Sequence, residues 1–161
     1  MRNFFLVVFA LATIIGTSSC NSGALVFNNK MVEVQKSLEP KIVAFGNKMQ
    51  AIGENGDIKT IAGDAKALME VLDKEIAKVK ALEAPKNGEE FKRSMLAQFE
   101  YVKKICSQTI KLGEASTTDE EKMKIATDFM NAGEEAAKLE QDTQTKQREF
   151  AKANGFKLES K

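Results

Sequence analysis

Hydrophobic residues recur every three or four positions along four long stretches of this chain, with polar residues between them. This spacing gathers apolar side chains on one face of an α-helix. No segment has the alternating pattern of a strand. We therefore predict an all-α protein, an antiparallel four-helix bundle with up-down-up-down topology, built from residues 29–161 after an N-terminal signal peptide. The predicted helices run from about Asn29 to Ile52, from Ile58 to about Leu82, from about Glu90 to Gly113 and from Asp119 to about Asn154.

Proline, glycine and short polar residues mark the predicted helix ends. Asn28 suits the N-cap of the first helix, where Phe27 and Val32 would form a hydrophobic staple. Pro40 lies inside this helix and predicts a kink, because proline cannot donate the backbone hydrogen bond. Pro85 ends the second helix.

The last two helices have their own end signals. Asn87, followed three residues later by Glu90, predicts a capping arrangement for the third helix. The fourth helix opens after residues 116–118 and ends at a glycine C-cap, Gly155. Its stretch 140–149 is almost entirely polar, so we expect this helix to extend beyond its partners there.

The first 19 residues have the three parts of a secretory signal peptide. Arg2 supplies positive charge, residues 4–15 are apolar except for Thr13, and small residues precede Cys20. The apolar run is too short to cross a bilayer, which needs about 20 residues. A cysteine directly after the small residues is typical of a bacterial lipoprotein, in which its thiol carries diacylglycerol. Thr17 is a departure, since leucine is usual at that place.

Two interpretations of this segment remain open. In the first, residues 1–19 are a lipoprotein signal, Cys20 is the lipid attachment site, and residues 20–28 form a short tether. In the second, a general signal peptidase cleaves after Ser19 and the protein is freely secreted. Lipidation predicts a palmitate-bearing membrane protein of the cell envelope, at the periplasmic or surface face of the outer membrane. Residues 24–27 would then touch lipid headgroups or pack on the end of the bundle, and we expect packing.

The mature chain has balanced charge. It contains 24 − 1 = 23 basic residues once Arg2 is removed, against 23 acidic ones, and lysine and glutamate are interleaved. No basic patch would neutralise phosphates, so we expect no nucleic-acid partner. The partners that fit are the membrane, through the lipid, and an unidentified protein or small ligand. The pattern does not determine the oligomeric state.

The residues that most enzymes and metal sites require are missing. The chain has no histidine, which removes the usual proton shuttle and the common haem, zinc and di-iron ligand sets. It has no glycine-rich phosphate loop either. Residues 54–57 offer oxygen atoms beside a glycine, but a helix–helix turn explains them better than a calcium loop. We expect no enzymatic activity, no catalytic residue, no metal site and no cofactor.

Cysteine and methionine fit the predicted core. Cys106 shares helical spacing with Met95, Phe99, Val102 and Ile110, so we expect a buried thiol instead of a reactive one. Six methionines remain after residue 19, nearly all on apolar stripes, and we expect them in the core instead of lining a binding groove.

Two stretches resemble a family of small bacterial surface lipoproteins. The first is Phe27-Asn28-Asn29 followed by Val32 and Gln35. The second contains Val79, Leu82, Pro85, Gly88, Phe91, Phe99 and Tyr101. The resemblance implies a lipid-anchored helical bundle without an established activity, and it supplies no catalytic residue. We therefore expect a non-enzymatic envelope protein that binds or scaffolds a partner, or alternatively an extracytoplasmic carrier of a small apolar ligand between its helices.

Overall fold

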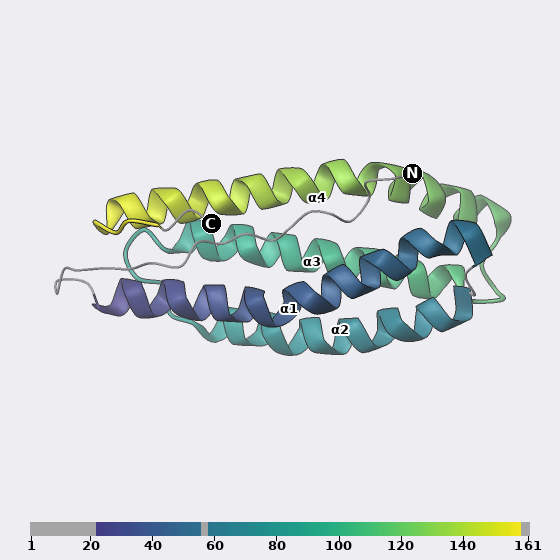
Figure 1. Ribbon diagram of the computed structural model, residues 1–161, viewed down its shortest axis with the longest axis horizontal. Coiled ribbons are helices and arrows are strands. Elements are labelled where there is room, and N and C mark those ends of the chain that lie inside the picture. Colours follow the sequence, from purple (N-terminus) through teal and green to yellow (C-terminus); the bar gives the residue numbers. More distant parts are fainter. Residues whose placement is uncertain (1–21, 56–57, 159–161) are drawn as a thin grey trace.

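The computed structural model describes residues 22–55 and 58–158, which form an all-α four-helix bundle (Figure 1). Consecutive helices run in opposite directions and pack as neighbours, α1 on α2, α2 on α3 and α3 on α4. The predicted fold class is confirmed. The helices are α1 (Ser22–Asn55), α2 (Ile58–Ala81), α3 (Glu89–Leu112) and α4 (Asp119–Ala153).

The apolar stripes meet in one core. Leu72, in the middle of the α2 stripe, is fully buried, as is Phe99 of α3. Burying a leucine or phenylalanine side chain stabilises the fold by about 1.5–3 kcal/mol relative to exposure, so these stripes hold the helices together. The core includes the following side chains, among others: Met31, Leu38, Phe45, Ala65, Leu68, Ile76, Val79, Phe91, Met95, Cys106 and Phe150.

The first helix begins at Ser22, several residues before the predicted start near Asn29. Ala24 and Phe27 continue the helical spacing of Met31 backward, and both are buried. Asn28 is consequently not an N-cap, and residues 22–28 are not a tether; they are turns of α1. The rings of Phe27 and Phe91 are 6.1 Å apart, and aromatic burial of this kind favours a longer helix.

The polar end of α4 does not extend beyond its partners, so that prediction was also wrong. Thr143 is 1% exposed and Gln147 is 2% exposed. The reason is the early start of α1, whose added turns contact the last turns of α4 through the Gln147–Asn28 hydrogen bond. The rings of Phe27 and Phe150 are 5.5 Å apart at this contact.

The third helix starts differently from the prediction. Its N-cap is Gly88, which makes no side-chain cap, and the Glu90 carboxylate pairs with the Arg93 guanidinium instead of a backbone N–H. Asn87 has a φ of 67°, and the Gly88 N–H donates to the Pro85 carbonyl at 2.8 Å. A side chain at Gly88 would come within 3.0 Å of Pro85, so this tight turn determines where α3 begins.

Both ends of α4 are where the sequence predicts them. The Thr118 hydroxyl accepts a hydrogen bond from the Glu121 N–H, and the Glu121 side chain accepts from the Thr118 N–H, which makes a capping box. At the other end, Gly155 has a φ of 74° and the Phe156 N–H donates to the Ala151 carbonyl at 2.9 Å. This is the predicted glycine cap.

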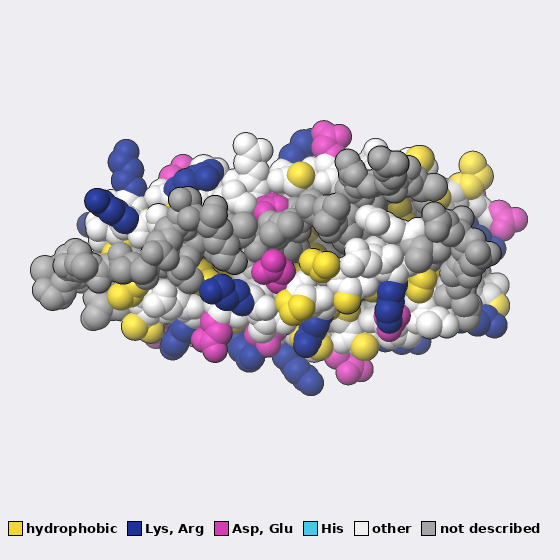
Figure 2. Space-filling model, in the orientation of Figure 1, with side chains coloured by type: hydrophobic (Ala, Val, Ile, Leu, Met, Phe, Trp, Pro, Cys, Tyr) yellow, Lys and Arg dark blue, Asp and Glu magenta, His cyan; other side chains and the backbone are white. Residues whose placement is uncertain are grey.

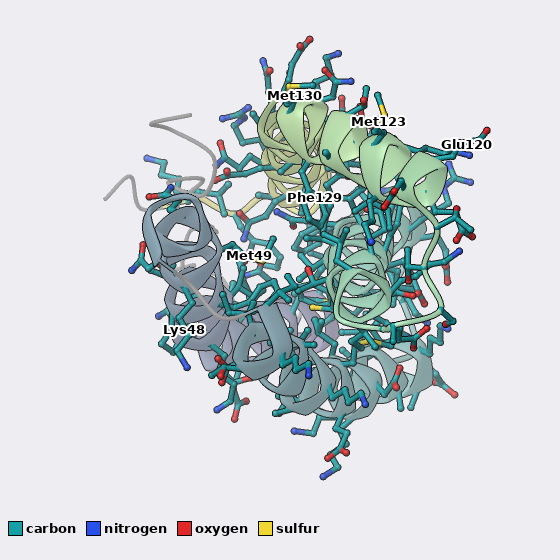
Figure 3. The ribbon with its side chains drawn as sticks, turned by 90° about the vertical axis from the view of Figure 1, so that its right-hand side faces the viewer. Lys48, Met49, Glu120, Met123, Phe129 and Met130 are labelled. Carbon is teal, nitrogen blue, oxygen red and sulfur yellow. The ribbon has the colours of Figure 1, made fainter. Side chains whose placement is uncertain are left out.

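Helix α1 is continuous through Pro40 but changes direction about halfway along its length, where that residue falls (Figure 1). The bend agrees with the predicted kink. Seen from the end of the bundle that holds the α3–α4 connection, α1 and α4 are spread apart, and Met49 and Phe129 lie on their facing sides (Figure 3).

Candidate functional site

A polar groove runs between α3 and α4. It contains two adjoining cavities, of about 460 Å³ and about 540 Å³, which share Lys104, Gln108 and Asp128. The first cavity is also lined by Tyr101, Ile105, Asn131, Glu134, Glu135 and Lys138. The second is also lined by Ser107, Lys111, Glu121, Lys124 and Ile125. Both are surface grooves with mixed charge.

Tyr101 occupies one end of this groove. Its hydroxyl donates to the Ala132 carbonyl of α4 at 3.4 Å, and the Lys104 ammonium lies 5.9 Å from the ring centre. Burial raises the pKa of Tyr101 above its ordinary value, and the nearby Glu135 and Asp128 carboxylates raise it further. The phenol therefore stays protonated at neutral pH and links α3 to α4.

Polar contacts between α3 and α4 continue along the groove. The Gln108 amide donates to the Asp128 carboxylate, while the buried Gln108 Oε1 has no protein partner. Lys111 pairs with Glu121 at 2.6 Å. This lysine, followed by the N–H and hydroxyl of Thr118, lowers the pKa of Glu121 to about 2. Tyr101, Gln108 and Lys111 of the lining therefore link α3 to α4.

The side chains of the groove offer no recognisable catalytic arrangement. Its lining contains amides, lysines, carboxylates, two isoleucines, the Ser107 hydroxyl and a protonated phenol, without a thiol or an imidazole. Across residues 22–55 and 58–158, no group of three or more histidine, cysteine or acidic side chains is arranged to hold a metal ion. A polar ligand could make hydrogen bonds to this lining.

The structure describes only one of the two cysteines. Cys20, the predicted lipid attachment site, lies outside the residues that the structure describes, as does the predicted signal peptide. Cys106 is fully buried, as predicted, and burial raises the pKa of its thiol to about 12. The turn considered for calcium is only partly described: residues 54 and 55 close α1, whereas 56 and 57 lie outside.

The methionines divide into two groups. Met31 and Met95 are buried, while Met49 and Met69 pack against the core, as predicted. Met123 and Met130 do not, because their side chains are 74% and 67% exposed. Both lie on the outer side of α4 (Figure 3). They are close in sequence to Ile125 and Phe129 of the apolar stripe, but they are not part of that stripe. The core prediction was wrong for these two.

Residues 24–27 are partly buried and partly exposed. Ala24 and Phe27 pack inside the end of the bundle, as expected, whereas Val26 is 51% exposed on the same helix. A helix forces this division, since neighbouring residues point about 100° apart around its axis.

Sequence reasoning missed a buried amide pair. The Gln147 amide donates to the Asn28 Oδ1 at 2.9 Å, in the core between α1 and α4. The sequence predicts a cap at Asn28 and an exposed polar stretch around Gln147. One sequence feature could have indicated the burial of Asn28: it lies seven residues before Gln35, so both side chains fall on the same face of α1, and both are buried.

Charged side chains of both signs are interspersed on the described part of the face in Figure 2, with hydrophobic groups between them. Several of the lysines pair with carboxylates, among them Lys48 with Asp64 and Lys103 with Asp73. No helix of the described chain is both long enough and apolar enough to cross a membrane. In comparisons with known proteins, no family model, no curated protein and no solved structure matches this chain.

Proposed function

We propose that this protein is a lipid-anchored, non-enzymatic helical bundle of the bacterial cell envelope that binds or scaffolds a partner. Cys20 would carry the lipid after removal of residues 1–19, and the outer membrane is the expected location. The support comes from the signal pattern, from the resemblance to small surface lipoproteins, and from a bundle whose α3–α4 groove is polar and is crossed by its own hydrogen bonds and an ion pair.

The observation that carries this proposal is where α1 begins. Among the described residues, α1 starts at Ser22, two positions after Cys20, and Ala24 is the first core side chain. Cleavage before Cys20 would therefore remove the apolar leader without removing any of the core residues 24–151. An exported lipoprotein requires that its folded core remain after the leader is removed, and the described core meets this requirement.

The bundle favours a scaffold over a carrier of an apolar ligand. A carrier requires an apolar cavity of several hundred cubic ångströms. The cavities at the α3–α4 groove have that size, but lysines, carboxylates and amides line them. The side chains of Leu72 and Phe99, at the centre of their helices, are fully buried against protein. A carrier of a small apolar ligand remains the alternative proposal, but no specific feature of the bundle favours it.

The anchor is tested by fractionating cells that express the full chain. Cys20→Ser should move the protein from the membrane fraction to the soluble fraction, and intact mass should show diacylglycerol and acyl chains only on the unaltered chain. Cys106→Ala is the matched control, because it removes the other cysteine and should leave the protein in the membrane. An unmodified Cys20 in the wild-type mass spectrum would refute the lipoprotein proposal.

The partner is tested by purifying the protein from membranes under native conditions and identifying what accompanies it. A scaffold predicts a protein that is retained in stoichiometric amount and cross-links to the bundle. Recovery of a small apolar molecule from organic extracts, with no protein partner, would favour the carrier instead.

A further inference from the structure

One end of the bundle brings together both ends of the described chain. The N-terminus of α1, the connection between α2 and α3, and the C-terminus of α4 all lie there (Figure 1). Contacts between these parts hold the end together. The ring of Phe27 in α1 lies 6.1 Å from that of Phe91 in α3 and 5.5 Å from that of Phe150 in α4. The end is therefore a fixed surface, which we call the terminal face.

The terminal face includes exposed and half-buried apolar side chains. Val26 is 51% exposed, and Phe156 and Leu158 are only partly buried. Three exposed lysines belong to the same end, Lys86 in the connection, Lys152 in the last turn of α4 and Lys157 after it, and the connection also carries the exposed Glu83. None of these three lysines forms an ion pair within the described residues. Exposed apolar groups together with lysine side chains suit the interface between lipid headgroups and acyl chains.

The opposite end of the bundle carries acidic side chains. The first turn of α4 carries Asp119, Glu120 and Glu121, and the Glu120 side chain points away from the bundle (Figure 3). Glu121 pairs with Lys111 and Asp119 with Lys122, whereas Glu120 forms no ion pair within the described residues, and a negative surface potential repels its carboxylate. The charge distribution thus favours one orientation of the bundle toward an anionic bilayer, with the terminal face inward.

The length of chain before α1 limits the position of the terminal face. Only two residue steps separate Cys20 from Ser22, and a fully extended chain spans at most about 3.6 Å per residue, or about 7 Å in total. The headgroup region on each side of a bilayer is about 5–8 Å thick. Val26 follows Ser22 by one turn, about 6 Å along the helix axis. A lipid on Cys20 therefore leaves no room for a gap between membrane and bundle.

We infer that the terminal face rests on the membrane that holds the anchor, with Val26 and Phe156 in contact with the lipid interface. This inference depends on the proposed lipidation of Cys20. It adds a second membrane contact to the acyl chains and holds the bundle upright, so that the exposed Met123 and Met130 of α4 lie well above the bilayer.

Fluorescence quenching tests this arrangement, because the chain contains no tryptophan and a single one reports its own depth. Phe156→Trp and Val26→Trp place the reporter at the terminal face, and Met123→Trp is the matched control near the other end. The lipidated proteins are reconstituted in vesicles of phosphatidylcholine and phosphatidylglycerol with brominated acyl chains. We expect at least twofold quenching and a blue-shifted emission at positions 26 and 156, with little change at 123.

Each remaining outcome contradicts the inference. Equal quenching at all three positions would mean that the bundle lies on its side, and no quenching at 26 and 156 would mean that it stands away from the bilayer. Intact mass of the same samples separates this result from the parent proposal. Lipid present without quenching overturns the terminal-face contact alone, whereas absence of lipid on Cys20 overturns the anchor.

Discussion

The side-chain amide of Gln147 donates a hydrogen bond to the side-chain oxygen of Asn28 across 119 residues of sequence. Both side chains are almost completely buried, at 2% and 0% exposure. A polar side chain in such a place loses its water, and its partner replaces that water only if α1 and α4 are in one particular register. The pair therefore aligns two helices that α2 and α3 otherwise separate in the chain.

Truncating this pair should destabilise the bundle. Asn28→Ala and Gln147→Ala should each lower the free energy of unfolding by about 1–3 kcal/mol, because each removes the hydrogen bond that joins two buried side chains. The double variant should cost less than the sum, by at least about 0.5 kcal/mol. Urea denaturation measures all three. Gln141→Ala, at an exposed position of the same helix, should change stability by less than about 0.5 kcal/mol. Strict additivity would show that the hydrogen bond does not form.

The centre of the α2 stripe should be the most sensitive part of the core. Leu72 is fully buried between Leu68 and Ile76, so Leu72→Ala should cost about 2–5 kcal/mol through lost burial and a cavity. This is a large share of the 5–15 kcal/mol or so that is typical of a domain. Lys74→Ala, on the exposed side of the same helix, should cost under about 0.5 kcal/mol. Similar small effects at both positions in urea melts would contradict the self-contained bundle.

The capping box of α4 gives a third prediction. Thr118→Ala removes the acceptor for the Glu121 N–H and should lower the free energy of unfolding by about 0.5–2 kcal/mol. Thr127→Ala is the matched control, since this exposed hydroxyl only donates to the carbonyl one turn earlier and alanine suits a helix interior better. Thermal melts should show a clearly lower melting temperature for Thr118→Ala than for Thr127→Ala. Equal stability would mean that the cap is not formed in solution.

The same cap predicts a pH dependence. The pKa of Glu121 falls from its ordinary value of 4.5 to about 2 in the folded protein, so the unfolded chain binds a proton before the folded one does. Its contribution to stability is therefore complete above about pH 4.5 and is lost between about pH 4.5 and pH 2. The stability difference between the wild type and Glu121→Gln should shrink over that interval. High salt should also reduce it, because the Lys111–Glu121 pair is exposed.

The Cys106 thiol should be chemically silent in the folded protein. Burial raises its pKa to about 12, so almost no thiolate exists at pH 8, and the sulfur is inaccessible to reagents. In the Cys20→Ser variant, an aromatic disulfide reagent should detect no thiol before urea is added and one per chain after unfolding. Fast reaction of the native protein would show that α3 opens readily at this position.

The sequence was sufficient for the parts of this fold that depend on local chemistry. Apolar residues three and four positions apart predicted the four helices, because that spacing is a property of one helix by itself. Pro85 and Gly155 predicted helix ends correctly, since one lacks a backbone donor and the other adopts a positive φ. The burial of Cys106 followed from its place on the α3 stripe.

The tertiary structure decided what each helix face meets. Asn28 and Gln147 read as a cap and a solvated side chain because nothing local shows that they are partners. Asn87 failed as a cap because the turn from Pro85 to Gly88 places its backbone at a φ of 67°. Periodicity tells which side chains share a face, but burial depends on a second helix that comes from a distant part of the chain. Only packing therefore revealed that α1 begins at Ser22 and that the polar end of α4 is covered.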